Sequence, residues 1–367
     1  MSFKILDRYI FKQVLTATIM GIFLFIVVWI SPEILFKIIK RFINGDISFI
    51  LAVKLFFLEI PEILSKAIPV GLMIGCLFVF DRLSKDSELT IIRVAGVSVG
   101  RLILPVLFLS IIGMSVCLFI YKDIIPYTTT EIKRLKGDIF QHHFVYIDKK
   151  EDKQPKQILI VGGFDGKNIY DVKLLRFSGQ VKIDTPLLKS IITSEKAKIF
   201  DNHWSLIKAT QYEIAPSGVY QEIKKFDTLD IFDAKSAKEA EQLLVYSTKR
   251  PREMKNKDLK DYIGLLKSLD MPDEYRFTLS KYYQRFSHSA GCIFLAICGV
   301  LLGISKPREK RFLGFTAGAA LIFVYYILVP FLDMMAQTGA LPSIIAAWGP
   351  NIIVLAVIGI LIKYRNV

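Results

Sequence analysis

Long apolar runs constrain the fold of this chain more than any other feature. They lie at about residues 14–30, 55–80, 102–125, 290–304, 312–332 and 344–362. A helix needs about 20 mainly apolar residues to cross the hydrocarbon core of a bilayer. We therefore expect six membrane spans. The chain is 53% hydrophobic but still 22% charged, which is typical of a membrane protein that also carries a polar domain.

The second run is the least regular of the six. It contains Pro61 and Pro69, and its first half carries Glu59, Glu62 and Lys66. Each proline removes a helical hydrogen bond, so we expect an irregular helix whose freed carbonyls find partners inside a bundle. Charges at this depth point inward or mark the water-facing start of the span.

Between the third and fourth runs, the pattern changes to short segments with partial alternation. These lie at residues 139–147, 157–161, 168–177, 190–200, 204–214 and 219–232, and Gly, Asp, Asn, Pro and Ser separate them. Strands at this spacing predict an all-β sandwich or barrel over residues 126–275. Apolar residues at helical spacing then predict a short helix at 255–269, ended by Met271-Pro272, that leads back to the membrane.

Basic residues predict the orientation of the chain. The N-terminus, the 81–101 loop, the 306–311 loop and the C-terminus all carry Lys or Arg, whereas residues 333–343 carry none. The positive-inside rule places the basic segments, and both termini, in the cytoplasm. Cytoplasmic loops and contact with anionic lipid explain the net charge of +14 without nucleic acid.

One basic cluster breaks this rule. Lys37, Lys40 and Arg41 follow the first span on the outer side, at spacings of three and four that share one helix face. We interpret them as ligands for the phosphates of a lipid headgroup. The alternative is that they only anchor the span in ordinary headgroups.

The segment from Asp81 to Ser98 is too short and too charged to span a membrane. Asp86 or Ser87 is expected to cap a helix, Glu88 suits its first turn, and Gly96 suits its end. Leu89, Ile92 and Ala95 share one face, while Arg93 lies outside that set. The pattern predicts a helix over about residues 84–98, at the membrane surface, that docks a partner, or else an ordinary solvated loop helix.

Catalytic and metal-binding motifs are missing from the sequence. There is no Gly-x-x-x-x-Gly-Lys-Ser/Thr, His-Glu-x-x-His or Gly-x-Ser-x-Gly string. The cysteines Cys76, Cys117, Cys292 and Cys298 all lie in apolar runs, which favours small core residues. His142-His143 falls on a predicted strand, where the rings point to opposite faces and metal binding by the pair is disfavoured. We expect no catalytic residue, metal or cofactor in this chain.

Two strings carry a family resemblance. Arg82-Leu-Ser-Lys-Asp-Ser-Glu-Leu-Thr-Ile-Ile-Arg-Val-Ala-Gly-Val-Ser98 and the segment from Lys249-Arg-Pro-Arg-Glu-Met254 to Leu266 resemble the lipopolysaccharide export permease family of the LptF/LptG type. The resemblance extends over essentially the whole chain. It implies six spans with a periplasmic β-jellyroll domain. The chain departs from the family at Arg285-Phe-Ser-His-Ser-Ala290, where the family usually has a proline.

The resemblance also implies partners. A second permease of this type and a periplasmic bridge protein would accompany the chain in the bacterial inner membrane, and a cytoplasmic ABC ATPase dimer would bind the ATP. Ser87, Glu88, Leu89, Ile92 and Arg93 would then couple to the ATPase.

Lipopolysaccharide would pass through the β domain. Its acyl chains would contact Phe144, Ile160, Leu175 and Trp204, although each of these also suits an ordinary core. The alternative function is a membrane-anchored sensor or scaffold whose β domain binds a ligand or protein. Co-purification with an ATPase would separate the two functions.

Overall fold

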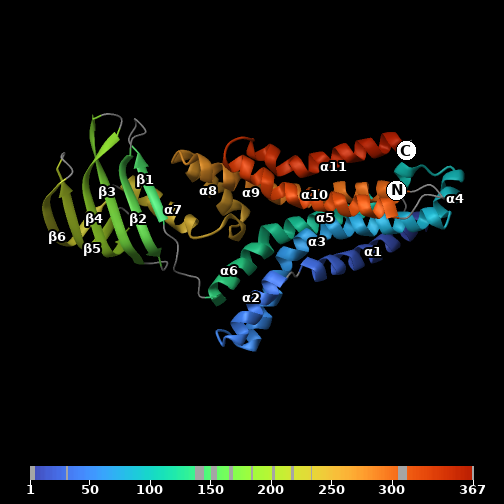
Figure 1. Cartoon of the computed structure of the whole chain (residues 1–367), viewed down its shortest axis with the longest axis horizontal. Helices are drawn as coiled ribbons and strands as arrows, with labels where there is room; N and C mark the ends of the chain where they lie inside the picture. Colours follow the sequence, from blue (N-terminus) through green and yellow to red (C-terminus); the bar gives the residue numbers. More distant parts are fainter. Residues whose placement is uncertain are drawn as a thin grey trace. The chain divides into compact units, whose positions relative to one another are not determined.

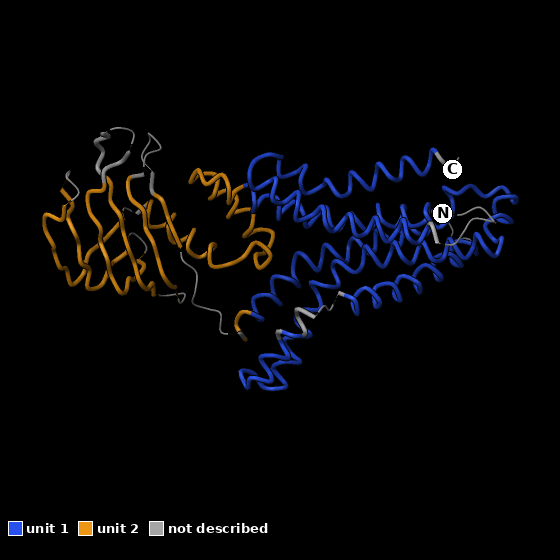
Figure 2. The backbone as a smooth tube through the Cα atoms, in the orientation of Figure 1, with its two compact units in different colours: residues 1–132, 276–367 blue, residues 133–275 orange. Residues whose placement is uncertain are grey.

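The chain divides into two compact units, which are coloured separately in Figure 2. The computed structural model describes residues 5–29, 32–136, 144–149, 155–164, 168–182, 185–200, 203–215, 219–232, 234–304 and 312–365. The helical unit comprises residues 1–132 and 276–367, and the β unit comprises residues 133–275. The β unit begins later than the expected residue 126, because the third span continues as a helix beyond the predicted boundary.

The helical unit contains the predicted spans (Figure 1). Among the described residues, six helical segments are long and apolar enough to cross a membrane. The helices concerned are α1 (Ile5–Trp29), α3 (Phe49–Lys85), α5 (Val99–Phe119), α9 (Pro272–Gly303), α10 (Phe312–Gln337) and α11 (Ser343–Arg365). The π-helix η1 (Ile120–Ile124) and α6 (Ile125–Lys136) extend α5, while α2 (Pro32–Ile43) and α4 (Glu88–Val94) are short. The six-span prediction is confirmed.

The spanning helices extend beyond the predicted apolar runs, and the fourth does so most at its start. The fourth was expected near residues 290–304, but α9 starts at Pro272, because proline at the first helical position needs no backbone donor. Residues 285–290 lie inside this helix, so the missing family proline leaves no break. In α3, Pro69 frees the carbonyl of Ser65, and the Cys117 thiol lies 3.7 Å from that oxygen. The expected partner inside the bundle is therefore present.

Close helix contacts hold α3 at the centre of the helical unit. Gly75 of α3 lies against Thr18 of α1, where an added Cβ would come within 2.6 Å of the threonine hydroxyl. Gly303 of α9 lies against α3, where an added Cβ would come within 2.7 Å of the Leu77 carbonyl oxygen. Small residues let backbones approach closely, and such contacts associate helices where lipid removes the hydrophobic drive.

Polar groups connect the last three spans. Asp333 of α10 accepts hydrogen bonds from Ser280 (2.8 Å) and Gln284 (2.6 Å) of α9, and Lys281 pairs with the same carboxylate. Asn351 of α11 donates to the Ser287 carbonyl at 2.7 Å. Buried charges in a membrane need such partners, so this network favours α9, α10 and α11 remaining together.

The β unit contains one antiparallel sheet with its strands in chain order. The strands are β1 (Phe144–Lys149), β2 (Pro155–Phe164), β3 (Asn168–Lys182), β4 (Thr185–Ile199), β5 (Trp204–Ile214) and β6 (Tyr220–Ile231). The inserted all-β domain is confirmed. Within the described residues each strand pairs with its neighbours in sequence, so the sheet is a meander, without the crossing connections of a two-sheet jellyroll.

One face of the sheet forms the core of the β unit. Helix α7 (Ala234–Ser247) packs against β1 and buries Ala237, Ala240, Leu243 and Leu244. The sheet residues of this covered face are buried, and they include Tyr146, Leu159, Val161, Val172, Leu174, Ile192, Trp204, Leu206 and Ala209. The predicted helix before the fourth span is confirmed as α8 (Asn256–Ser268), after the 3-10 turn η2 (Pro251–Glu253).

Candidate functional site

The docking segment forms a helix shorter than expected. Helix α4 begins at Glu88 and ends at Val94, because Ser87 takes a left-handed conformation (φ 60°) before it and Gly96 takes one (φ 83°) after it. The predicted stop at Gly96 is confirmed. The predicted side-chain cap is wrong: Ser87 makes no capping bond, and Asp86 instead ends α3.

The two faces of α4 differ in burial. Leu89 is buried in the core of the helical unit, and Ile92 packs partly against the same core. Ile91 and Val94 are 67% and 84% exposed, and Arg93 is also exposed. The inward residues anchor α4, so its exposed side chains are Thr90, Ile91, Arg93 and Val94, of which Ile91 and Val94 are the large apolar ones. The sequence interpretation missed Ile91 and Val94, although both fall outside the Leu89–Ile92–Ala95 face.

Contacts from α1 brace this segment. The Tyr9 hydroxyl donates to Glu88 Oε2 at 2.9 Å. Arg101, in the first turn of α5, binds Asp7 at 2.7 Å, and the Asp7 side chain is almost fully buried. Ser98 caps α5 by accepting from the Arg101 amide. Glu88 thus has an intramolecular partner, which any test of its role must separate from a contact with another protein.

The basic cluster lies on its own helix rather than at the end of the first span. Lys40 and Arg41 occupy the last turn of α2, where the helix dipole favours cations. Lys37 belongs to the same helix at the expected spacing, but its side chain lies outside the described residues. The sequence interpretation missed this separate helix. Its signal is Pro32, which suits the first turn of a new helix.

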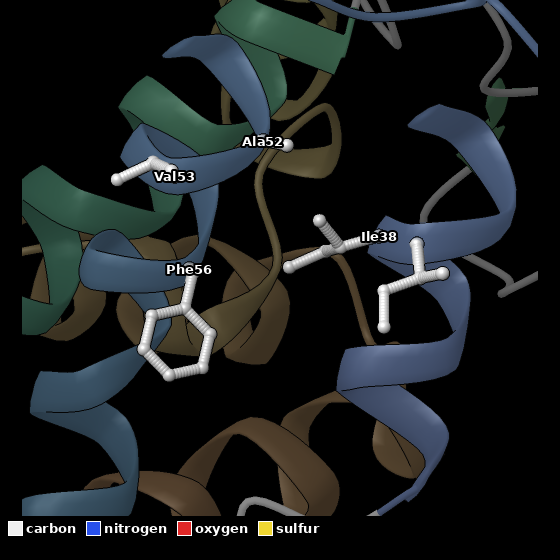
Figure 3. Close-up of a pocket in the computed structure, with 5 residues that line it drawn as sticks. Ile38, Ala52, Val53 and Phe56 are labelled. Carbon is white, nitrogen blue, oxygen red and sulfur yellow. The ribbon is translucent and has the colours of Figure 1, made fainter. Parts of the chain in front are cut away.

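An apolar pocket of about 260 Å³ opens beside the basic turn (Figure 3). Ile38 and Ile39 of α2 line one side, and Ala52, Val53 and Phe56 of α3 line the other. Phe36 and Ile43 of α2 are largely exposed. Cationic groups and an apolar hollow on neighbouring residues can hold an amphiphile that has acyl chains and an anionic headgroup.

The structure separates the four residues expected in a lipid conduit. Phe144 and Trp204 are buried on the covered face, where the Trp204 ring packs edge-on to Phe232. Ile160 and Leu175 are only partly buried, and strand alternation places them on the other face, which we call the open face. The four residues therefore do not face one interior.

The open face carries a row of apolar side chains that crosses all six described strands. Its neighbours are paired in the sheet register: Ile147 with Ile158, Ile158 with Leu175, Leu175 with Ile191, Ile191 with Tyr212, and Tyr212 with Ile223. Ile147 and Ile223 are exposed. We call this set the apolar row. These residues are brought into line only by the pairing of the strands, so the sequence by itself did not predict the apolar row.

Near the apolar row the β unit offers an ion-paired lysine, and the described residues offer no metal site. Beside the apolar row, bonds from Lys224 to Glu222 and then to Glu213 raise the pKa of the lysine, which keeps it cationic. The described residues contain no group of three or more His, Cys, Asp or Glu side chains that could hold a metal. His142 and His143 lie outside the described residues.

Comparison with known proteins agrees with this architecture. The sequence profile of the family described as lipopolysaccharide export system permease LptF/LptG matches residues 8–364. Proteins described as lipopolysaccharide export system permease protein LptF, from Escherichia coli (strain K12) and Shigella flexneri, are 24% identical over 107 residues. That segment spans 29% of this chain and 29% of each relative. The profile covers both the helical unit and the inserted sheet, and the chain belongs to the lipopolysaccharide export system permease LptF/LptG family.

Proposed function

We propose that this chain is the permease subunit of an ABC-type lipopolysaccharide exporter in the bacterial inner membrane. It would extract lipopolysaccharide from that membrane together with a second permease, and pass it through the periplasmic β unit to a bridge protein. A separate cytoplasmic ATPase dimer would bind the ATP and supply the energy. Family membership supports this proposal, and the exposed apolar surface on α4 is the observation that carries it.

The α4 surface suits a protein partner. Ile91 and Val94 expose apolar side chains on either side of Arg93, at one end of the membrane spans. Exposed apolar groups beside a charge are typical of a docking surface. The expected occupant is the ATPase, because a lipid exporter that has no nucleotide loop of its own needs a partner to supply energy.

Replacing Ile91 or Val94 with Asp tests this contact with little risk to folding, since both side chains already face outward. We expect each variant to weaken co-purification of the ATPase by roughly ten-fold or more. Thr90→Asp on the same helix is the matched control for the added charge. Full assembly and lipid-stimulated ATPase activity in I91D and V94D would contradict the proposed contact.

The role of Glu88 is tested by comparing two variants, because its side chain also has a partner within the chain. Glu88→Ala removes both the proposed partner contact and the hydrogen bond from Tyr9, whereas Tyr9→Phe removes only that bond. We expect E88A to uncouple ATP hydrolysis from lipid transport and Y9F to leave coupling largely intact. Equal losses in both variants would assign Glu88 only the role of bracing α4.

The basic turn of α2 is the proposed site for the lipid phosphates. Each contact would be a charge-assisted hydrogen bond contributing about 1.5 to 3 kcal/mol before the cost of desolvating the cation. Several such contacts would favour a multiply phosphorylated lipid over ordinary phospholipid. The neighbouring pocket would take part of an acyl chain.

The test replaces Lys37, Lys40 and Arg41 together with Glu. We expect lipopolysaccharide binding to be lost while membrane insertion and ATPase pairing persist. Ala52→Phe, which fills the pocket without changing charge, should weaken binding to a smaller extent. Lys122→Glu, at an exposed position of η1, controls for charge reversal. Unchanged binding in the triple variant would leave those residues only an anchoring role.

The open face is the proposed path for the acyl chains through the β unit. The apolar row provides a continuous strip perpendicular to the strands, which the packed covered face does not offer. Ile160 and Leu175 keep their predicted role on this face, whereas Phe144 and Trp204 are better explained as core residues.

Photo-crosslinkers at Ile158, Ile160 and Leu175 should capture lipopolysaccharide in the assembled complex only when ATP is present. The same group at Leu159, the neighbouring residue on the covered face, is the control and should capture none. Absence of adducts at all three open-face positions, or equal capture at Leu159, would argue against a lipid path on this face.

A further inference from the structure

A crease crosses the sheet of the β unit. On five adjacent described strands the register is interrupted while the pairs on both sides of the gap stay aligned. One pair is missing between β2 and β3, between β3 and β4, and between β5 and β6, and two consecutive pairs are missing between β4 and β5. For example, Val161 pairs with Val172 and Gly163 with Tyr170, but the residues between them are unpaired. The interrupted row consists of Gly162, Asp171, Glu195, Lys208 and Asp227.

Two members of this row have unusual backbones. Asp171 and Lys208 take positive φ values of 48° and 53°, a region that residues other than glycine rarely occupy. Such conformations persist where the surrounding structure requires them, and they cluster at binding sites. Next to Asp171, Gly162 leaves the space that a Cβ would fill at 2.8 Å from the Asp171 Cβ.

The crease changes which side chains face outward. In β3 the buried residues are Ile169, Val172 and Leu174, so the two consecutive residues Tyr170 and Asp171 both lie outside the covered face. The alternation shifts in the same way at Glu195 of β4 and Lys208 of β5. The outward residues surround a hollow of about 520 Å³, lined by Tyr170, Asp171, Thr193, Ser194, Glu195, Lys208 and Thr210. We call it the crease hollow.

The chemistry of the crease hollow fits a sugar. Tyr170 supplies an aromatic ring, and Asp171 and Glu195 supply carboxylates that accept hydrogen bonds from hydroxyl groups. Thr193 and Thr210 can both donate and accept. A phosphate acts mainly as an acceptor, and here it would meet two carboxylates against the single cation of the lining, Lys208. A saccharide ring offers several hydroxyl donors together with C–H groups that pack on an aromatic ring.

The position of the hollow links it to the apolar row. Asp171, Glu195 and Lys208 lie four residues along their strands from Leu175, Ile191 and Tyr212. At about 3.3 Å per residue, these three residues lie roughly 13 Å from the apolar row, while Thr193 and Thr210 at the near edge of the hollow lie about 7 Å from it. The open face is therefore apolar in one band and polar in the next, as an amphiphile with acyl chains and a saccharide headgroup requires.

We propose that the crease hollow is a subsite for the saccharide part of the transported glycolipid. This inference rests on the proposed lipid path along the open face. The acyl chains lie on the apolar row while sugar hydroxyls bind Asp171 and Glu195 beside the Tyr170 ring. The subsite distinguishes glycolipid from phospholipid by its sugar, independently of the phosphate contacts proposed at α2.

The experiment places a photo-crosslinker at Thr210, in the hollow, or at Leu175, in the apolar row, of the assembled complex. The probes are lipopolysaccharide, phosphatidylglycerol and the soluble oligosaccharide released from lipopolysaccharide by mild acid. We expect lipopolysaccharide to label both positions and phosphatidylglycerol to label Leu175 at most. The oligosaccharide should label Thr210 alone.

Asp171→Asn, which retains a residue type that tolerates positive φ, should reduce oligosaccharide labelling at Thr210 by roughly ten-fold. Thr228→Ala, at an exposed site on β6, should not change it. Labelling of Leu175 but not Thr210 by lipopolysaccharide would overturn the saccharide subsite alone. Absence of labelling at Leu175 would overturn the lipid path, and the oligosaccharide would still report on the hollow. Equal labelling of Thr210 by phosphatidylglycerol would also contradict the subsite.

Discussion

Lys133 and Glu253 form an ion pair that joins the two ends of the β unit. The Lys133 ammonium lies 2.6 Å from Glu253 Oε2 and also donates to the Thr248 carbonyl at 3.0 Å. The side chain of Glu253 is only 3% exposed, whereas that of Lys133 is 26% exposed. Removing the lysine should therefore destabilise the protein more than removing the glutamate, because an unpaired lysine can be rehydrated whereas an unpaired buried carboxylate cannot.

We expect Lys133→Met to destabilise the β unit by about 3 kcal/mol or more, since it leaves a buried carboxylate without its cation. Glu253→Gln should cost less, because the amide can still accept from the Arg250 backbone amide, as Glu253 does at 3.1 Å, and the lysine can turn to solvent. Thermal unfolding of the full chain in detergent measures both. A larger loss in E253Q than in K133M would contradict this assignment of the buried charge.

Tyr262 of α8 predicts a pH dependence. Burial, and secondarily the charge of Glu274, raises the pKa of Tyr262 from 10.0 to about 12. The folded state thus holds the phenol proton more tightly than the unfolded state does. Its contribution to stability is complete below pH 10 and is lost as the pH rises towards 12. Between those values, wild type should lose more stability than Tyr262→Phe, measured by chemical denaturation. Equal losses of stability in wild type and Tyr262→Phe would show that other titrating groups account for the pH dependence.

At the scale of elements, close packing between α1 and α3 depends on Gly75. A leucine there would force its Cβ into the backbone and hydroxyl of Thr18, at 2.6 to 2.8 Å. We expect Gly75→Leu to separate the two helices and lower the yield of folded protein. Gly359→Leu in α11 is the matched control, because no heavy atom lies within 4 Å of its added Cβ. Similar yields of the two variants would show that this contact is dispensable.

Local signals in the sequence predicted most elements but not their exact limits. Turn residues between short alternating segments located the strands, and apolar length located the spans. The sequence analysis did not predict helix α7 (Ala234–Ser247). Its inward positions are mostly alanines, with leucines only near its end, and charged residues lie between them, so no clear apolar pattern stands out. Helix α2 was not predicted as a separate helix, because its apolar residues follow the first span so closely that they resemble its continuation.

The candidate sites were only partly predictable, for a physical reason. Neighbours in sequence located α4 and the basic turn of α2. The apolar row and the crease hollow depend on how six strands align, and a shift of one residue in register would move each side chain to the other face. Alternation alone also left Phe144 and Trp204 open as either conduit or core residues, because it identifies a face without showing that α7 covers it.

At the scale of the whole molecule, the orientation in the membrane stays a prediction from basic residues, and the native cysteines make it directly testable. All four cysteines of the chain are fully buried in the helical unit. A membrane-impermeant maleimide should therefore leave the wild-type protein unlabelled, so single added cysteines report their own side. Thr90 of α4 and Thr228 of β6 are exposed and suit this purpose.

Added to intact spheroplasts, the reagent should label Thr228→Cys at once, because the β unit is expected in the periplasm. It should label Thr90→Cys only after detergent opens the membrane, because α4 is expected to face the cytoplasmic ATPase. The wild-type chain is the control in both conditions. Labelling of Thr90→Cys in intact spheroplasts would place α4 outside, where it could not meet an ATPase. The basic residues of the 81–101 segment would then be an exception to the positive-inside rule rather than evidence for it.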